Sequence, residues 1–189
     1  MRGDDVSSPS AWIVRWAHLI APGGSVLDVA AGGGRHARWL ALRGHRVTAI
    51  DRDADAMAAL DDCAETIAAD IENGAWPLSG RCFDGVVVTN YLWRPLFPLL
   101  RAALAPGGVL LYETFAAGNE TVGRPRRTEF LLAHAELLGA AKGLRIVAYE
   151  DGFLAAPDRF VQRLAALRAG DADASARYPL APGPGSGEG

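Results

Sequence analysis

The stretch from residue 26 to residue 40, VLDVAAGGGRHARWL, constrains the fold more than any other part of the chain. It begins with apolar residues typical of a strand, breaks at three consecutive glycines, and continues as a helix that ends near a further glycine. Glycines between a strand and a helix let the backbone approach a ligand closely, because no Cβ atom intervenes. The stretch therefore predicts a strand–turn–helix unit with a ligand at its turn.

The alternation of strands and helices continues along most of the chain. Strands are expected at residues 25–30, 46–50, 66–69, 83–90, 109–115, 144–149 and 160–167. Helices are expected at residues 11–20, after a cap at Ser8 or Ser10, and at residues 35–42, 54–62, 96–105 and 129–139. The last two strands are separated by only about ten residues, which suits a hairpin better than a helical crossover. The fold class predicted is α/β: a doubly wound, seven-stranded, mostly parallel sheet with a C-terminal antiparallel hairpin.

Composition limits the classes of protein to which the chain can belong. A chain of 189 residues is about one domain, and we expect it at residues 10–168, between a flexible tail at 1–9 and a disordered tail at 169–189. The net charge of −3 argues against general affinity for nucleic acid or an anionic membrane, and no apolar run is long enough to span one. Neither cysteine has metal-ligand spacing, so we expect no metal and a cytoplasmic protein with reduced thiols.

Polar residues and glycines end the expected strands. The residues that terminate the first five strands are Gly32, Asp51, Asp70, Asn90 and Glu113. Ligands of doubly wound sheets bind where the carboxyl ends of the strands meet, so these residues are candidates for one site.

The glycine turn has two interpretations. The spacing Gly32-x-Gly34-x-x-Ala37 fits a dinucleotide fingerprint, which would indicate a nicotinamide or flavin cofactor. However, Asp28 lies inside the strand, and Asp28-x-Ala30-x-Gly32-x-Gly34 resembles the first motif of the class I S-adenosylmethionine-dependent methyltransferases. The chain departs from that motif at Ala30, where the family usually has glycine, and the departure leaves slightly less room for the backbone.

The resemblance extends over about residues 10–168 and implies a cofactor site along the strand ends. An acid near the turn suits the ammonium group of S-adenosylmethionine, Asp51 suits the ribose diol, and Asp70 suits the adenine amine. The implied cofactor-binding residues are Asp28, Ala30, Gly32, Gly34, Asp51, Arg52, Asp70, Ile71 and Asn90. Asp51 and Asp70 also each precede a helix or a turn, so a capping role remains open for both.

The acceptor side is expected in the loops after the fourth and fifth strands. Tyr91 and Trp93 are candidate walls for a planar or apolar substrate, with ordinary packing as the alternative. Glu113 ends the fifth strand, and Arg124 and Arg126 lie in a basic loop that either binds an anionic acceptor or is solvated surface.

The resemblance is to the small bacterial tellurite-resistance and thiopurine-type methyltransferases, which implies a Rossmann-like methyltransferase fold. The expected function is methyl transfer from S-adenosylmethionine to a small molecule by in-line displacement, with S-adenosylhomocysteine as product. We expect no nucleic-acid or membrane partner, while the oligomeric state and the acceptor atom stay open. A non-catalytic protein that binds this cofactor is the main alternative, followed by a nicotinamide-dependent oxidoreductase.

Overall fold

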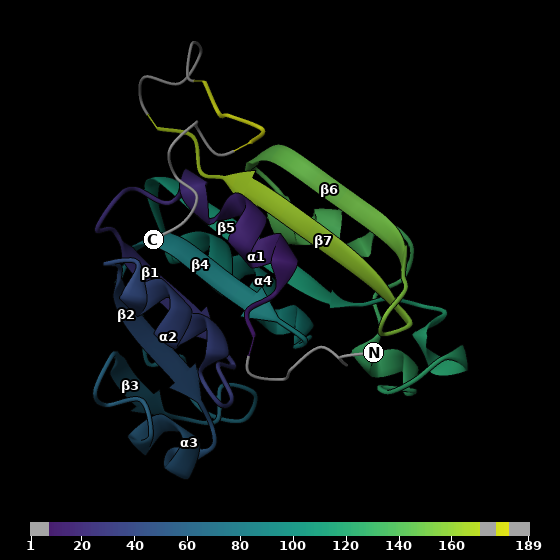
Figure 1. Ribbon diagram of the computed structural model, residues 1–189, viewed down its shortest axis with the longest axis horizontal. Coiled ribbons are helices and arrows are strands. Elements are labelled where there is room, and N and C mark those ends of the chain that lie inside the picture. Colours follow the sequence, from purple (N-terminus) through teal and green to yellow (C-terminus); the bar gives the residue numbers. More distant parts are fainter. Residues whose placement is uncertain (1–7, 171–176, 182–189) are drawn as a thin grey trace.

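The strands form one sheet in the order β3-β2-β1-β4-β5-β7-β6, in a computed structural model that describes residues 8–170 and 177–181 (Figure 1). The strands are β1 Ser25–Val29, β2 Arg46–Asp51, β3 Glu65–Ala68, β4 Phe83–Thr89, β5 Leu104–Phe115, β6 Arg145–Leu154 and β7 Arg159–Leu167. The first five are parallel to one another, and β7 runs antiparallel between β5 and β6. The expected doubly wound, mostly parallel sheet with a terminal hairpin is confirmed.

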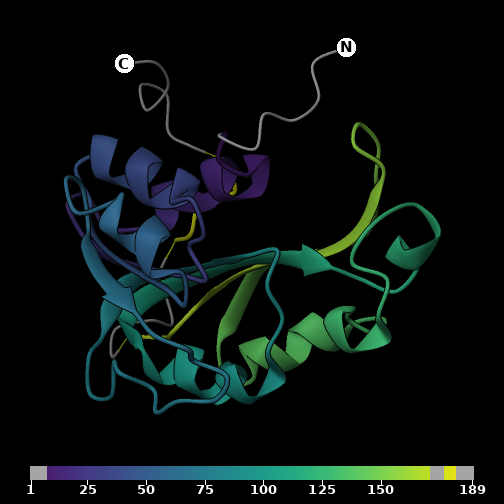
Figure 2. The same cartoon turned by 90° about the horizontal axis from the view of Figure 1, so that it is seen from below.

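Helices cover both faces of the sheet (Figure 2). The helices α1 Ala11–Trp16, α2 Arg35–Leu42 and α3 Ala54–Ala58 lie on one face, and α4 Phe97–Ala102 lies on the other. Short 3-10 segments occur at η1 Ala17–Leu19, η2 Arg94–Leu96, η3 Asn119–Thr121, η4 Thr128–Phe130 and η5 Glu136–Ala141. Each face buries its own apolar cluster, so β1 and β4 are buried on both sides.

The N-terminal helix begins at a serine cap, as expected. The Ser10 hydroxyl accepts from the backbone N–H of Trp12, and the helix buries Trp12, Ile13 and Trp16. The indole Nε1–H of Trp12 donates to the carbonyl of Leu164 on β7 at 3.1 Å. The helix is therefore attached to a strand from the far end of the chain.

Residues 129–139 do not form the expected helix. The backbone of Leu132 pairs with the end of β5, donating to Phe115 and accepting from Ala117. The side chain of Gln162 on β7 accepts from Leu137 N–H and donates to the Ala133 carbonyl. The segment forms the short turns η4 and η5 instead, because these tertiary contacts use backbone groups that a helix needs.

Other element boundaries also differ from the sequence prediction. The helix expected at residues 54–62 ends at Ala58, and the helix expected at 96–105 is divided into η2 and α4. The fifth strand begins at Leu104 rather than at residue 109, because Leu104 already pairs with Phe83 across a register shift.

The expected tails lie mostly outside the described residues. Within the C-terminal stretch the structure describes residues 177–181, where the ring of Tyr178 lies 4.9 Å from the Arg145 guanidinium. His18 Nε2 also lies 3.0 Å from the Pro179 carbonyl oxygen. In the described part of the chain, no helix is long and apolar enough to cross a membrane.

Candidate functional site

The carboxyl ends of β1 to β5 open into a cleft of about 1220 Å³. It is lined by residues from the glycine turn, from the ends of β2 to β5, and from the loop after β5. The residues expected from the sequence that line it are Ala30, Gly32, Asp51, Arg52, Asp70, Ile71, Asn90 and Tyr91. The crossover connections bring these residues together because all parallel strands end at the same edge of the sheet.

The glycine turn presents bare backbone to the cleft. Gly32 has a φ of +52°, and a Cβ atom added at Gly32 or Gly33 would meet no protein atom within 4 Å. Gly34 is different, because a Cβ atom there would lie 2.3 Å from the side chain of Leu60. Gly32 and Gly33 thus keep space open in the cleft, whereas Gly34 permits close packing between α2 and the segment after α3.

Two residues other than glycine also adopt left-handed backbone conformations at the cleft. Ala30 has a φ of 53° and Asn90 a φ of 54°. This conformation costs an alanine roughly 1–2 kcal/mol, and such strain gathers at functional sites. Ala30 stands where the related motif has glycine, so the strain is a direct result of that departure.

Asp51 holds the glycine turn in place. Its Oδ2 accepts from the backbone N–H of Gly32 at 2.9 Å, and its Oδ1 accepts from the N–H of Asp53 at 3.0 Å. Each carboxylate oxygen has further acceptor capacity, so the group can also receive the hydroxyls of a diol.

Asp70 both caps a turn and faces the cleft. Its carboxylate accepts from the backbone of Glu72 and Asn73 and from the side-chain amide of Asn73. The Asn73 side chain, followed by these two backbone donors, lowers the pKa of Asp70. The exposed carboxylate is therefore kept as an acceptor at the cleft edge.

Asp28 lies beneath the cleft rather than in its lining. The side chain is 1% exposed, and its Oδ2 has no hydrogen-bond partner. Burial raises the pKa of Asp28 to about 7, although the backbone amide of Ala37 and the charge of Arg35 act in the opposite direction. A buried carboxyl oxygen without a partner is rare, and one beneath a ligand cleft favours a cationic group there.

His36 and Thr89 line the cleft and were not anticipated from the sequence. The His36 side chain is 1% exposed. Its Nε2 accepts from the backbone N–H of Ser10 at 3.0 Å, and its Nδ1 lies 3.4 Å from the Thr89 hydroxyl. Burial, followed by the charge of Arg35, lowers the pKa of His36 to about 3. No local sequence signal shows that a backbone amide will reach this ring.

The acceptor half of the cleft is mostly apolar. Its walls include Leu92, Phe115, Pro125 and Phe130, together with the expected Tyr91. The Tyr91 hydroxyl donates to Glu72 at 3.0 Å, and burial raises the pKa of Tyr91. Sequence reasoning missed the four apolar residues because they come from three segments of the chain: the loop after β4, the end of β5 and the segment that follows β5.

Four expected acceptor residues are not brought into the cleft. Trp93 is half-buried and packs against the apolar cluster on the α4 face of the sheet. Glu113 is 1% exposed and forms an ion pair with Arg163, so it does not face a ligand. Arg124 and Arg126 are exposed beside Pro125, and Arg126 donates to the carbonyl of Gly123. Of these three neighbouring residues, Pro125 is the one that lines the cleft.

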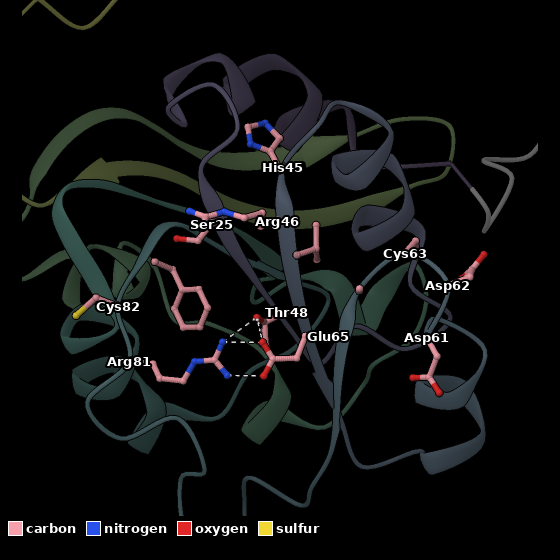
Figure 3. A pocket seen from close by; sticks show the side chains of 13 residues that line it. Ser25, His45, Arg46, Thr48, Asp61, Asp62, Cys63, Glu65, Arg81 and Cys82 are labelled. Atoms are coloured by element: carbon pink, nitrogen blue, oxygen red, sulfur yellow. Dashed lines mark hydrogen bonds and ion pairs between the residues drawn. The ribbon is translucent and has the colours of Figure 1, made fainter.

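A second hollow, of about 580 Å³, lies at the opposite edge of the sheet (Figure 3). It contains the amino-terminal ends of β1 to β4, far along each strand from the glycine turn. Its most prominent charges neutralise each other, because Arg81 forms a bidentate pair with Glu65 at 2.6 and 2.7 Å and also donates to Thr48 (Figure 3). In the described residues, no group of three potential ligands is placed to hold a metal.

The residues of the large cleft fit S-adenosylmethionine, the group that the sequence resemblance implies. The cofactor carries no phosphate, and the turn offers an unpartnered buried carboxyl oxygen at Asp28. Open space above Gly32 and the acceptors Asp51 and Asp70 on neighbouring strands suit a ribose and an adenine amine. The donor and acceptor chemistry of the cleft is therefore consistent with this cofactor.

Comparison with known proteins agrees with this geometry. Residues 26–108 match a family described as a methyltransferase domain, while no curated protein matches the chain. The fold is similar to that of TehB from Haemophilus influenzae, with a TM-score of 0.66 and 22% identity over 80% of this chain and 59% of TehB. A TehB-like S-adenosylmethionine-dependent methyltransferase from Corynebacterium glutamicum gives a TM-score of 0.59 and 21% identity, over 79% of this chain and 85% of that one.

A third similar structure contains a ligand. The glycopeptide N-methyltransferase MtfA, solved with S-adenosylhomocysteine, has a TM-score of 0.56 and 19% identity, over 80% of this chain and 86% of MtfA. At these identities the likenesses concern the fold, and the chain spans only 59% of the length of TehB. Residues 26–108 thus match a methyltransferase-domain family, and the chain shares its fold with S-adenosylmethionine-dependent methyltransferases.

Proposed function

We propose that the protein transfers a methyl group from S-adenosylmethionine to a small molecule that has an apolar body. The observation that carries this proposal is the continuity of the cleft, in which a polar half at the glycine turn adjoins an apolar half at Phe115 and Phe130. Its volume of about 1220 Å³ exceeds that of most sites for a single drug-sized ligand. Such a cleft has room for cofactor and acceptor side by side.

The polar half holds the cofactor in this proposal. Asp51 accepts hydrogen bonds from the ribose diol, and Asp70 with the Ile71 amide contacts the adenine. Asp28 lies beneath the ammonium group and supplies the negative charge that it needs. When bound, the cofactor supplies a methyl group on a positively charged sulfur, which is an activated donor.

The apolar half orients the acceptor and excludes water. Its lining consists of Tyr91, Leu92, Phe115, Pro125 and Phe130. In-line transfer depends chiefly on holding nucleophile, methyl group and sulfur in one line, which well-packed walls achieve. We also propose that Arg124 and Arg126, exposed on the loop of Pro125, bind an anionic group of the acceptor at the cleft mouth.

A methyl-transfer assay tests the proposal. The protein is incubated with S-adenosylmethionine carrying a labelled methyl group and a cell extract divided by filtration into small molecules and macromolecules. We expect label to enter the small-molecule fraction with wild-type protein and not with Gly32→Val. Label found only in the macromolecular fraction would contradict the proposed acceptor class, and the labelled product identifies the acceptor by mass spectrometry.

A further inference from the structure

A line of buried polar contacts runs from β7 to the wall of the cleft. Arg163 Nε lies 2.7 Å from Glu113 Oε2, and the Ser10 hydroxyl donates to Glu113 Oε1 at 3.1 Å. The backbone N–H of Ser10 then donates to His36, which contacts Thr89. Ser10, His36 and Glu113 are each no more than 7% exposed. Of these residues, His36 and Thr89 reach the cleft.

The contacts settle which nitrogen of His36 carries the proton. A backbone N–H can only donate, so Nε2 must be the acceptor towards Ser10, and the hydrogen of the neutral ring lies on Nδ1. The pKa of His36, lowered to about 3 by burial and by Arg35, agrees with a neutral ring. The lone pair of the ring points at Ser10, so His36 is not available as a general base for the acceptor.

The Nδ1–H of His36 determines the direction of the Thr89 hydroxyl. Thr89 Oγ1 accepts from Nδ1–H, and its own hydrogen is then left to donate elsewhere. Thr89 ends β4 and lines the cleft, so an acceptor on a bound ligand can receive this hydrogen. His36 therefore converts a freely rotating hydroxyl into an oriented donor.

The order of the strands indicates which part of the cofactor meets this donor. Asp70 follows β3 and Asp51 lies on β2, so the adenosine part extends over these two strands in the proposed function. The chain of the cofactor then continues towards β1 and β4, where the glycine turn and Thr89 lie. Arg35, in the cleft lining beside His36, adds positive charge to the same region.

We propose that His36 is a positioning residue that orients the Thr89 hydroxyl as a donor to the carboxylate at the amino-acid end of S-adenosylmethionine. This inference rests on the proposed cofactor site. The carboxylate takes the hydrogen bond of Thr89 and the charge of Arg35, while the ammonium group lies near Asp28.

Two probes that differ only at the amino-acid end test the inference. S-adenosylhomocysteine carries the amino-acid group, and 5′-methylthioadenosine lacks it while keeping the adenine, ribose and sulfur. Calorimetric titration of Thr89→Val should show at least about tenfold weaker binding of S-adenosylhomocysteine, because a hydrogen bond to a charged group is lost. Binding of 5′-methylthioadenosine should be unchanged, and Thr89→Ser, which keeps the hydroxyl, should bind both probes like wild type.

A matched pair of variants tests the positioning role of His36. His36→Asn keeps a donor near the place of Nδ1, and His36→Gln keeps an acceptor near the place of Nε2 for the Ser10 amide. We expect His36→Asn to retain most of the affinity for S-adenosylhomocysteine and His36→Gln to lose as much as Thr89→Val. The double variant His36→Gln/Thr89→Val should bind S-adenosylhomocysteine as tightly as Thr89→Val alone, because the two changes remove the same interaction.

Three results would overturn the inference. One is equal weakening of both probes by Thr89→Val, and another is equal behaviour of His36→Asn and His36→Gln. The third is an imidazole ¹⁵N spectrum of wild-type protein that places the His36 proton on Nε2. If wild-type protein binds neither probe, the cofactor site itself is wrong and the inference falls with it. Thermal unfolding of each variant identifies changes that act only through folding.

Discussion

The carboxylate of Asp51 accepts a hydrogen bond from the backbone N–H of Gly32 at 2.9 Å, so the acid that ends β2 fixes the turn that follows β1. The two residues are 19 positions apart in the sequence and belong to different strand–turn units. Their contact means that the proposed ribose subsite and the glycine turn form as one structure. A change at either residue is therefore expected to affect cofactor binding.

Gly32→Val should abolish binding of S-adenosylmethionine while the fold persists. The added side chain meets no protein atom within 4 Å and occupies the cleft instead, at the cost of a strained φ. Calorimetric titration and circular dichroism measure the two effects separately. Gly34→Val is the matched control, because its Cβ clashes with Leu60 and should lower the melting temperature strongly. Wild-type affinity in Gly32→Val would remove the proposed cofactor site.

Asp51→Ala should weaken cofactor binding by roughly 1–3 kcal/mol, because the ribose loses an acceptor and the Gly32 amide loses its partner. Asp70→Ala should cost less, since the adenine also gains from packing and backbone contacts. Titration of each variant with S-adenosylhomocysteine measures the difference. Normal affinity in Asp51→Ala would show that the ribose lies elsewhere.

Asp28 should make the protein less stable as the pH rises from about 4 to 7. Its pKa in the folded state is about 7, against 3.8 ordinarily, so in this range the folded protein keeps a proton that the unfolded chain releases. The free energy of unfolding should fall by on the order of 4 kcal/mol over this range, at about 1.4 kcal/mol per pKa unit. Asp28→Asn should therefore be more stable than wild type at pH 8 and similar at pH 4, as measured by urea unfolding.

The control for this pH effect is Asp55→Asn, which changes an exposed carboxylate on α3. It should leave the stability difference between the two pH values as in wild type. If Asp28→Asn shows the same stability difference between pH 4 and pH 8 as wild type, the carboxyl group of Asp28 does not cause the pH effect. His36 should affect stability in the opposite direction, because its pKa is lowered to about 3 in the folded protein. Below about pH 6.5 the unfolded chain binds a proton at His36 that the folded protein does not, so wild type loses stability as the pH falls. His36→Asn should lose less stability over the same pH range.

Ala30→Gly should raise the stability of the protein by up to about 1 kcal/mol. Relief of the left-handed backbone at φ 53° exceeds the extra flexibility that glycine gives the unfolded chain. Thermal unfolding measures the change, and cofactor affinity should be retained. Ala31→Gly is the control. Ala31 does not have a positive φ, so this substitution relieves no strain and should destabilise the protein.

Arg124→Ala and Arg126→Ala should raise the Michaelis constant for the acceptor once it is identified, with nearly unchanged cofactor affinity. Both arginines are exposed on the loop that contributes Pro125 to the acceptor half. Steady-state kinetics with varied acceptor measure the effect. Unaltered constants in both variants would mean that this loop is solvated surface.

Local patterns allowed much of the fold to be predicted. A continuous apolar run such as Val86, Val87 and Val88 is typical of a strand buried on both faces, and all three residues are fully buried. The short spacing between the last two strands indicated the hairpin that β7 and β6 form. Residues 129–139 could not be predicted in this way, because contacts of Leu132 and Gln162 with distant segments override their helical pattern.

The site was predictable where it depends on strand ends and not where it depends on tertiary contacts. Gly32, Asp51 and Asp70 meet in one cleft because parallel strands share a carboxyl edge. The protonation of the His36 ring depends on a hydrogen bond from the Ser10 amide, 26 residues away, and no local pattern indicates this contact. Glu113 was also expected to end a strand, but it lies inside β5, and its side chain is turned towards Arg163 instead of the cleft.

The hydrogen bond from Trp12 to Leu164 joins residues 152 positions apart, with consequences for the order of folding during synthesis. While the ribosome is still adding the residues of β7, α1 can pack against β5 but lacks the Leu164 carbonyl that Trp12 binds in the complete fold. Strands β1 to β4 can assemble earlier, since their partners are already present. The attachment of α1 is therefore completed only when the last strand emerges, so a nascent chain stalled before residue 159 should expose α1 to proteases more than the complete chain does.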